Sequence, residues 1–168
     1  MADEAHSITL MTTVDIMGFP VSAYGLARVV ETALGWARSG EKLRYMACAN
    51  AHSLALARRD ERFGEALRHA DQLLPDGVGV LIAGRLLGRR IEEKIAGMEY
   101  FREFSRQANI QGGVSYFLLG STPTVLEQMV ERLARDYPSI IIAGCYSPPF
   151  KAKFDSNDTM AMVLVGPR

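Results

Sequence analysis

The fold is decided at residues 73–80, which read Leu-Leu-Pro-Asp-Gly-Val-Gly-Val. A short apolar run ends in Pro-Asp-Gly, and a second apolar stretch follows from Val78 to Leu87. This order predicts a strand, a sharp turn, and a helix whose first turn is almost bare of side chains. Glycines at such a turn let a ligand approach the backbone N–H groups closely. Asp76 stands at the junction, where its carboxylate can either cap the helix or face a ligand.

Strands and helices alternate outward from this turn. Apolar, β-branched runs predict strands at 8–14, 43–49, 114–119, 140–144 and 160–165, and a turn into a short strand at 16–21. Apolar stripes predict helices from Ser22, as the N-cap, to Arg38, and from Thr122, as the N-cap, to Asp136. Further helices are expected after Asn50, around Phe63, at 78–87, where an apolar helix would be packed inside, and at 97–109. The alternation predicts an α/β fold with a Rossmann-like, largely parallel sheet covered by helices on both faces.

The composition of the 168-residue chain is that of an ordinary globular protein. Its length predicts a single domain over residues 1–168. The balanced charge, 19 basic against 19 acidic residues, predicts no nucleic-acid partner. Cys48 and Cys145 lack metal-ligand spacing and indicate a reduced, cytoplasmic setting. No signal peptide or membrane-spanning run is visible, so any membrane contact is expected to be peripheral.

Polar residues and glycines follow several of the predicted strands. They are Asn50, Asp76, the Gly120-Ser121 pair and the loop from Tyr146 to Phe150. In parallel α/β sheets, ligands bind beyond the carboxyl ends of the strands. The sequence therefore predicts a small-molecule site on one rim of the sheet.

Each of these residues has both a structural and a functional interpretation. Pro-Asp-Gly is typical of a turn, but an Asp beside a glycine-rich helix start can also act as a general base. Asn50 either caps the next helix or hydrogen-bonds a sugar or base. Lys94, with Arg89 and Arg90, either neutralises a diphosphate or belongs to a solvated basic face. The chain has no Walker motif, no HExxH and no paired Cys/His cluster, which disfavours nucleotide hydrolysis at a P-loop and a standard zinc site.

Five motifs in order make the chain resemble a known family. They are Cys48-Ala49-Asn50, the turn at 75–79, Gly97-Met98-Glu99-Tyr100-Phe101, Phe117-Leu118-Leu119-Gly120 and Ser147-Pro148-Pro149-Phe150. With the opening run at 14–21, they resemble the WecG/TagA/CpsF glycosyltransferases, glycosyltransferase family 26. The resemblance covers nearly the whole chain, in the family's order and at its spacing.

The resemblance implies an inverting transferase that moves a sugar from a UDP-sugar to a polyprenyl-diphosphate-linked glycolipid acceptor. Such reactions build cell-surface polysaccharide or teichoic acid, and the sugar would be N-acetylmannosamine, its uronic acid or a glucose-type sugar. The family works without a metal ion, so no cofactor is expected, and leaving-group charge would fall on helix N-termini and cationic side chains. The expected location is peripheral, at the inner face of the bacterial cell membrane.

The resemblance also implies the site. Asp76 matches the family's general base, and Asn50 matches the Asn that holds a donor or acceptor sugar. The substrate-binding residues would be Cys48, Asn50, Gly77, Gly79, Lys94, Gly120, Ser121, Tyr146, Pro149 and Phe150.

The sequence departs from the family pattern at several positions. Cys48 stands in place of the usual Thr, Glu99 in place of Asp, and Lys94 in place of Arg, which keeps the charge but loses the bidentate fork. Residues 163–168 resemble the strand that leads into the family's Gly-x-Pro-Lys-Gln-Glu segment. The expectation is therefore a chain without the Gln-Glu pair and without the family's C-terminal membrane-docking appendage.

Other functions stay open beside this one. The first is a truncated, inactive family member that only binds nucleotide or partner subunits. The second is an unrelated Rossmann-like oxidoreductase, against which the missing Gly-x-Gly-x-x-Gly argues. A homo-oligomer also stays open, because several of the predicted helices have apolar faces.

Overall fold

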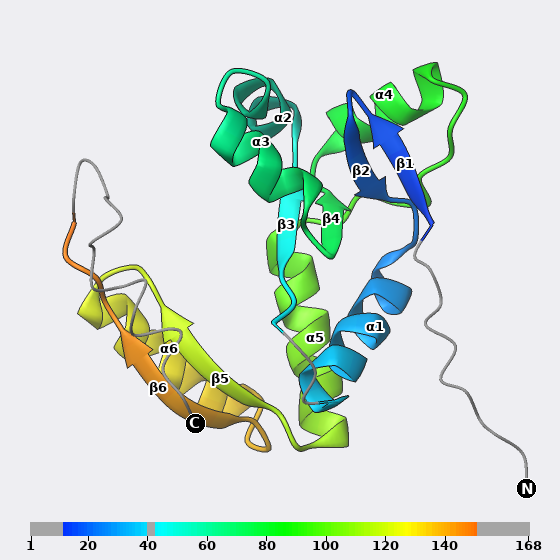
Figure 1. The fold of residues 1–168 in the computed structure, drawn as a ribbon. Coiled ribbons are helices and arrows are strands. Elements are labelled where there is room, and N and C mark those ends of the chain that lie inside the picture. Colours follow the sequence, from blue (N-terminus) through cyan, green and yellow to red (C-terminus); the bar gives the residue numbers. More distant parts are fainter. Residues whose placement is uncertain (1–11, 40–42, 151–168) are drawn as a thin grey trace, which may run out of the picture. The chain divides into compact units, whose positions relative to one another are not determined.

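The computed structural model describes residues 12–39 and 43–150. The class is mixed α/β, as the alternating pattern predicts, and the strand expected at 160–165 lies outside the described residues. The described elements follow one another as β1 (Thr13–Ile16), β2 (Phe19–Ser22), α1 (Leu26–Ser39), β3 (Met46–Ala49), α2 (Ala51–Ala57), α3 (Glu61–Arg68), β4 (Gln72–Pro75), α4 (Val78–Leu86), α5 (Gly97–Gln111), β5 (Ser115–Leu119), α6 (Pro123–Asp136) and β6 (Ile141–Tyr146) (Figure 1).

The strands of the described residues pair two by two. β1 and β2 form an antiparallel hairpin, whose turn places Met17 and Gly18 at positive φ, as two-residue hairpin turns require. β3 pairs with β4 in parallel, and β5 pairs with β6 in parallel. Helices α2 and α3 connect β3 to β4, and α6 connects β5 to β6. Parallel strands need such a crossover connection.

The chain divides into two compact units between Gln107 and Ala108, inside α5. In the first unit, the hairpin packs against β4 and α4 (Figure 1). Its core joins residues of the hairpin, β3, β4, helices α2 to α4 and two connecting segments: Val14, Ile16, Phe19, Val21, Ala23, Ala49, Leu54, Ala57, Leu67, Leu73, Val80 and Ile91. Ala49, the last residue of β3, belongs to this core.

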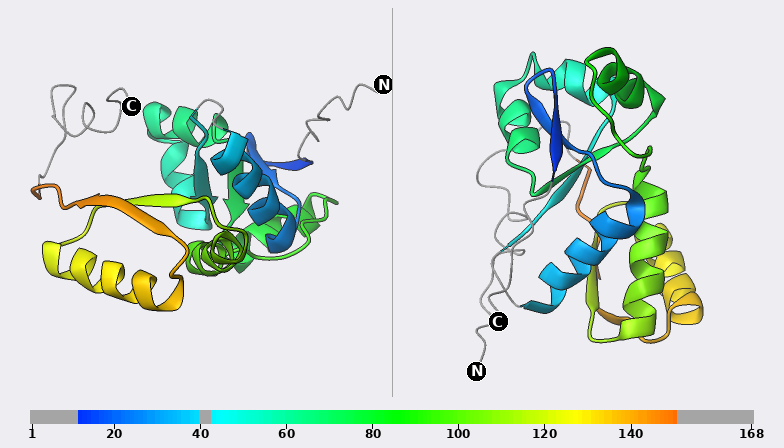
Figure 2. Two further views of the ribbon diagram at one scale, coloured as in Figure 1. Left: turned by 90° about the horizontal axis from the view of Figure 1, so that it is seen from below. Right: turned by 90° about the vertical axis from the view of Figure 1, so that its right-hand side faces the viewer.

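In the second unit, α6 runs along one face of the β5–β6 pair (Figure 2). The buried residues of this unit include one in β5, two on α6 and one directly before each strand: Leu118, Leu126, Leu133, Val114 and Ile140. Thr122 caps α6 by accepting a hydrogen bond from the backbone of Val125 at 3.4 Å, and Pro123 is the first helical residue. Both features of this helix start confirm the prediction.

The predicted start of the first helix is wrong. Ser22 belongs to β2 and is buried, and α1 begins at Leu26. The backbone N–H groups of Gly25 and Leu26 donate to the carboxylates of Glu92 and Glu93, at 2.7 and 2.6 Å. Carboxylates stabilise a helix N-terminus because they satisfy its open N–H groups and oppose the positive end of the dipole. The cap of α1 thus comes from a segment far along the chain.

The predicted burial of the helix after Pro-Asp-Gly is also wrong. Val80 and Gly84 are buried, but Val78, Ile82 and Leu86 are exposed. Of the described elements, the hairpin packs against α4 and the start of α2 lies beside Gly79, and the side chains of Val78, Ile82 and Leu86 stay uncovered.

Candidate functional site

The first unit brings Asn50 and Asp76 to the same edge of the β3–β4 pair. The parallel register sets Cys48 beside Leu74 and Ala49 beside Pro75, so both strands end at the same level. The N–H group of Asp76 donates to the carbonyl of Ala49 at 2.8 Å, which fixes the residue to the end of the neighbouring strand. Asp76 is half-buried at this edge.

Asn50 caps α2, which confirms the first of the two roles open to it. Its Oδ1 accepts a hydrogen bond from the N–H of Ser53, and the Ser53 hydroxyl oxygen accepts one from the N–H of Asn50, each at 2.9 Å. This reciprocal pair is a capping box, and the Asn-x-x-Ser spacing was the available sequence signal for it. The carbonyl oxygen of the side chain is therefore engaged, and its amide nitrogen is the end that can meet a ligand.

Gly77 makes the turn from β4 into α4. Its φ of 92° and ψ of 152° lie in a region that essentially only glycine adopts. A Cβ on Gly77 would lie 3.9 Å from the Asn50 Cβ, and a Cβ on Gly79 would lie 3.6 Å from the Ala51 Cβ. The starts of α2 and α4 are therefore adjacent, and α4 begins without a side-chain cap, so its first N–H groups can bind an anion.

Cys48 lies between Asp76 and the start of α5. Its Sγ would lie 3.5 Å from a Cβ placed on Gly97. Burial raises the pKa of the Cys48 thiol, and the negative charge of Asp76 raises it further. Cys48 is thus close enough to Asp76 for the charge of that carboxylate to act on the thiol.

The backbone segment that contains Lys94 is hydrogen-bonded to the same edge. The N–H of Ile95 donates to the carbonyl of Pro75 at 2.9 Å, which fastens this segment to the end of β4. The Lys94 ammonium lies 3.4 Å from the carboxylate of Glu99, which also accepts a hydrogen bond from the N–H of Ala96 at 3.0 Å. The Ala96 bond and then Lys94 lower the pKa of Glu99. Glu99 therefore caps α5 and holds Lys94, a partnership that the sequence did not reveal.

The second unit gathers the remaining predicted residues at the ends of β5 and β6. The N–H of Gly120 donates to the carbonyl of Tyr146 at 3.0 Å, and the Ser147 hydroxyl donates to the carbonyl of Ser121 at 2.7 Å. Gly120 and Ser121 both have positive φ, and Tyr146 is partly exposed. Pro149 and Phe150 follow as an exposed loop.

The predicted site residues thus form two groups, one in each unit. Cys48, Asn50, Asp76, Gly77, Gly79 and Lys94 belong to the first unit, and Gly120, Ser121, Tyr146, Pro149 and Phe150 belong to the second. Each group stands at the carboxyl end of a parallel strand pair. The prediction that both groups lie on one rim of a single sheet stays a prediction.

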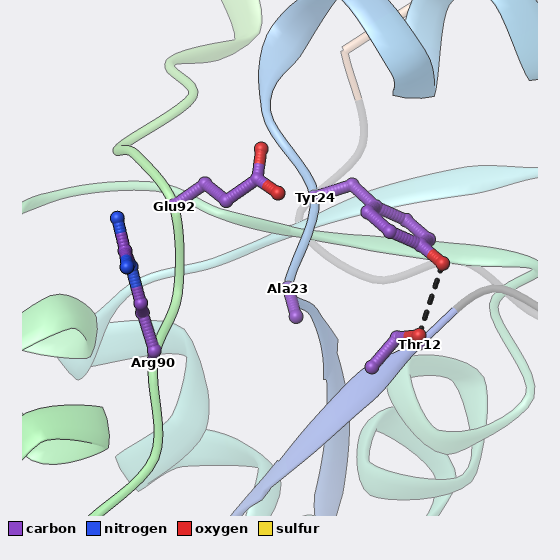
Figure 3. Close-up of a pocket in the computed structure, with 5 residues that line it drawn as sticks. All are labelled: Thr12, Ala23, Tyr24, Arg90 and Glu92. Atoms are coloured by element: carbon purple, nitrogen blue, oxygen red, sulfur yellow. Dashed lines mark hydrogen bonds between the residues drawn. The ribbon is translucent and has the colours of Figure 1, made fainter.

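A hollow of about 420 Å³ lies elsewhere in the first unit (Figure 3). It is lined by Thr12, Ala23, Tyr24, Arg90 and Glu92. The hydroxyl groups of Tyr24 and Thr12 are 3.0 Å apart, and this hydrogen bond lowers the pKa of Tyr24. The Glu92 carboxylate is engaged with the start of α1. None of the predicted site residues lines this hollow.

In the part of the chain that the structure describes, no His, Cys, Asp or Glu side chains gather in a group of three or more that could hold a metal ion. Over the same ranges, every helix is too short or too polar to cross a membrane.

Comparison with known proteins identifies relatives over most of the sequence. Residues 14–164 match the family model described as the glycosyl transferase WecG/TagA/CpsF family. A relative from Bacillus spizizenii, named N-acetylglucosaminyldiphosphoundecaprenol N-acetyl-beta-D-mannosaminyltransferase, is 35% identical over 88 residues, which are 52% of this chain and 34% of the relative. A protein of the same name from Staphylococcus aureus is 27% identical over 131 residues, or 77% of this chain and 51% of the relative. These matches span between about a third and a half of the relatives' length.

Proposed function

This chain belongs to the WecG/TagA/CpsF glycosyltransferase family, and from that premise we propose that it transfers a sugar to a polyprenyl-diphosphate-linked acceptor. The names of the relatives describe N-acetylmannosamine transfer onto an N-acetylglucosamine carried by diphosphoundecaprenol. The same acceptor class is proposed here, with a UDP-sugar as the donor. The oxidoreductase alternative gains no support from these relatives.

The observation that carries the proposal is the placement of Asp76. Asp76 is half-buried at the shared end of two parallel strands, and it directly precedes Gly77, which lies beside the Asn50 side chain and begins the uncapped helix α4. If Asp76 were only a turn residue, the neighbouring helix would have no need of an uncapped start. A base that works beside a diphosphate does need one, because the free N–H groups of the helix start can bind phosphate oxygens.

In the proposed reaction, the acceptor hydroxyl oxygen attacks the anomeric carbon of the donor sugar. Asp76 takes the hydroxyl proton, and the bond between that carbon and the phosphate oxygen of UDP breaks with inversion. The Asn50 amide nitrogen would donate to a sugar hydroxyl or carbonyl. The start of α4 and the Lys94 ammonium would stabilise the charge of the departing diphosphate.

The test compares the protein with Asp76→Asn by calorimetry with UDP-sugars and by sugar transfer to a lipid-linked acceptor. Asp76→Asn is expected to bind UDP-sugar while its turnover falls by about 100-fold or more, as loss of a general base predicts. Asp60→Asn is the matched control, since Asn also caps a helix well and Asp60 caps α3. Unchanged turnover in Asp76→Asn contradicts the base. Absence of uridine-nucleotide binding contradicts the donor, and binding without turnover in the unaltered protein favours the inactive-member alternative.

Charge stabilisation by helix N–H groups and Lys94 also predicts that turnover needs no metal ion. We expect the rate of transfer to be the same in EDTA as in added Mg²⁺. A rate that collapses with EDTA and returns with Mg²⁺ would contradict this part of the proposal.

The acceptor's lipid anchor further implies that the protein works peripherally at the inner face of the cell membrane. A homo-oligomer and a Rossmann-like sheet covered on both faces also stay predictions. The parallel pairs β3–β4 and β5–β6, each with its intervening helices, are the units from which such sheets are built.

A further inference from the structure

The outer face of α4 is apolar, which is the reverse of what a surface helix needs. Val78, Ile82 and Leu86 follow one another at a spacing of four residues and are 65%, 48% and 83% exposed. Residues four apart lie on the same face of a helix. Leu87, immediately after α4, is 55% exposed. The core-facing side of the same helix holds Val80 and Gly84, so both sides of α4 are apolar.

Positive charge borders this apolar face. Arg85 lies on α4, and Arg89 and Arg90 follow directly after it. Residues 77–91 contain no Asp or Glu. The nearest acidic residues after them, Glu92 and Glu93, accept hydrogen bonds from the start of α1. Among the described residues, no ion pair is recorded for these three arginines, which are all exposed.

An apolar helix face with arginines at its border fits the surface of an anionic bilayer. The apolar side chains enter the boundary between headgroups and acyl chains, while guanidinium groups remain at the level of the lipid phosphates. With nine residues, α4 is far shorter than a membrane-spanning helix and would lie in the plane of the surface. A protein partner would need an apolar groove with an acidic rim, whereas an anionic membrane supplies both features everywhere.

We propose that the exposed face of α4, formed by Val78, Ile82, Leu86 and Leu87 with Arg85, Arg89 and Arg90, docks on an anionic phospholipid bilayer. Because α4 begins directly after Asp76 and Gly77, the docked helix places the candidate base next to the membrane. That consequence rests on the proposed function, since it matters only for an acceptor held in the bilayer. The docking itself stands on the exposure and the charge.

The experiment is co-sedimentation of the full chain with vesicles of phosphatidylcholine alone and of phosphatidylcholine mixed equally with phosphatidylglycerol. The protein is expected to bind the anionic vesicles, and to bind less as salt is added. The double variants Ile82→Ser/Leu86→Ser and Arg85→Gln/Arg89→Gln are each expected to weaken binding by about tenfold or more. All four side chains are exposed, so the fold is expected to persist, and circular dichroism checks this.

The matched controls alter another exposed helix end in the same unit. Leu56→Ser and Arg58→Gln/Arg59→Gln remove an exposed leucine of α2 and two exposed arginines after it, and are expected to leave vesicle binding unchanged. No binding to anionic vesicles, or equal losses in the controls, overturns the proposal. A dimer that Ile82→Ser/Leu86→Ser converts to a monomer, without vesicle binding, also overturns it and assigns the face to a second copy of the chain.

The same variants separate this inference from the proposed function. UDP-sugar binding is measured on each by calorimetry. Loss of vesicle binding with intact nucleotide binding in the Ile82→Ser/Leu86→Ser variant supports the docking surface. Vesicle binding by a protein that binds no uridine nucleotide contradicts the proposed function and leaves the docking surface standing.

Discussion

Gly77 is the residue on which the geometry around Asp76 depends most directly. Its φ of 92° and ψ of 152° would strain any residue that carries a Cβ. Gly77→Ala is therefore expected to lower the free energy of unfolding in urea by about 1–3 kcal/mol. The strain can also be relieved by a shift of the turn, which would move Asp76, so the variant is expected to lose transfer activity as well.

The control for this prediction stands two residues further along. Gly79 is the second residue of α4, and a Cβ there would meet the Ala51 Cβ at 3.6 Å, an ordinary contact. Gly79→Ala is expected to leave stability unchanged or to raise it by up to about 1 kcal/mol, because alanine favours a helix. If both variants lose the same stability, the backbone of Gly77 is not the cause.

The pKa of the Cys48 thiol depends on the charge of Asp76, and it can be followed without any measurement of activity. In the Cys145→Ser variant, Cys48 is the remaining thiol, and its alkylation by iodoacetamide is followed against pH. Burial and Asp76 both raise its pKa, so the reaction is expected to set in above the pH at which an ordinary thiol reacts. Adding Asp76→Asn removes the smaller cause and is expected to shift the curve part of the way back. Adding Asp60→Asn, which alters the cap of α3 and a carboxylate that does not act on the Cys48 pKa, is expected to leave the curve in place.

At the scale of elements, the segment after α4 secures the start of α1. Glu92 and Glu93 accept the N–H groups of Gly25 and Leu26, and such caps contribute about 0.5–2 kcal/mol. Glu92→Ala/Glu93→Ala is expected to lower the free energy of unfolding by about 1–3 kcal/mol in urea. Glu31→Ala, an exposed position within α1, is the control and is expected to change it by less than about 0.5 kcal/mol. Equal effects of the two changes would contradict the cap.

These elements also show which features a sequence can predict. The start of α6 was predictable because Thr122 and Pro123 stand next to the helix they begin. The start of α1 was not, because its caps are 67 residues away. Apolar residues all round α4 indicated burial, but periodicity carries no information on how many neighbouring elements are present to cover a helix. The error at α4 is therefore one of tertiary context.

At the scale of the whole molecule, the distinction between local signals and long-range contacts also applies to the site. Asn50 and Asp76 could be placed together because each residue directly follows a strand, and the two strands form one parallel pair. The end of a strand is a signal that the local sequence carries. The hydrogen bond from Ile95 to the end of β4, which brings the segment of Lys94 to this edge, depends on how segments distant in the sequence pack. The division of the chain between Gln107 and Ala108 had no signal, because it falls inside the continuous helix α5, where a linker composition is absent.

The two compact units are expected to unfold in separate steps. Trp36, the single tryptophan, lies in α1 and reports on the first unit, whereas far-UV ellipticity reports on the helices of both. The two signals are therefore expected to give different midpoints in urea. Leu67→Ala and Leu133→Ala form a matched pair, since each removes a buried leucine, one from each unit, at about 2–5 kcal/mol. Leu67→Ala is expected to lower the Trp36 midpoint, and Leu133→Ala to lower only the ellipticity midpoint. Coincident transitions, shifted together by either variant, would show that the two units unfold as one.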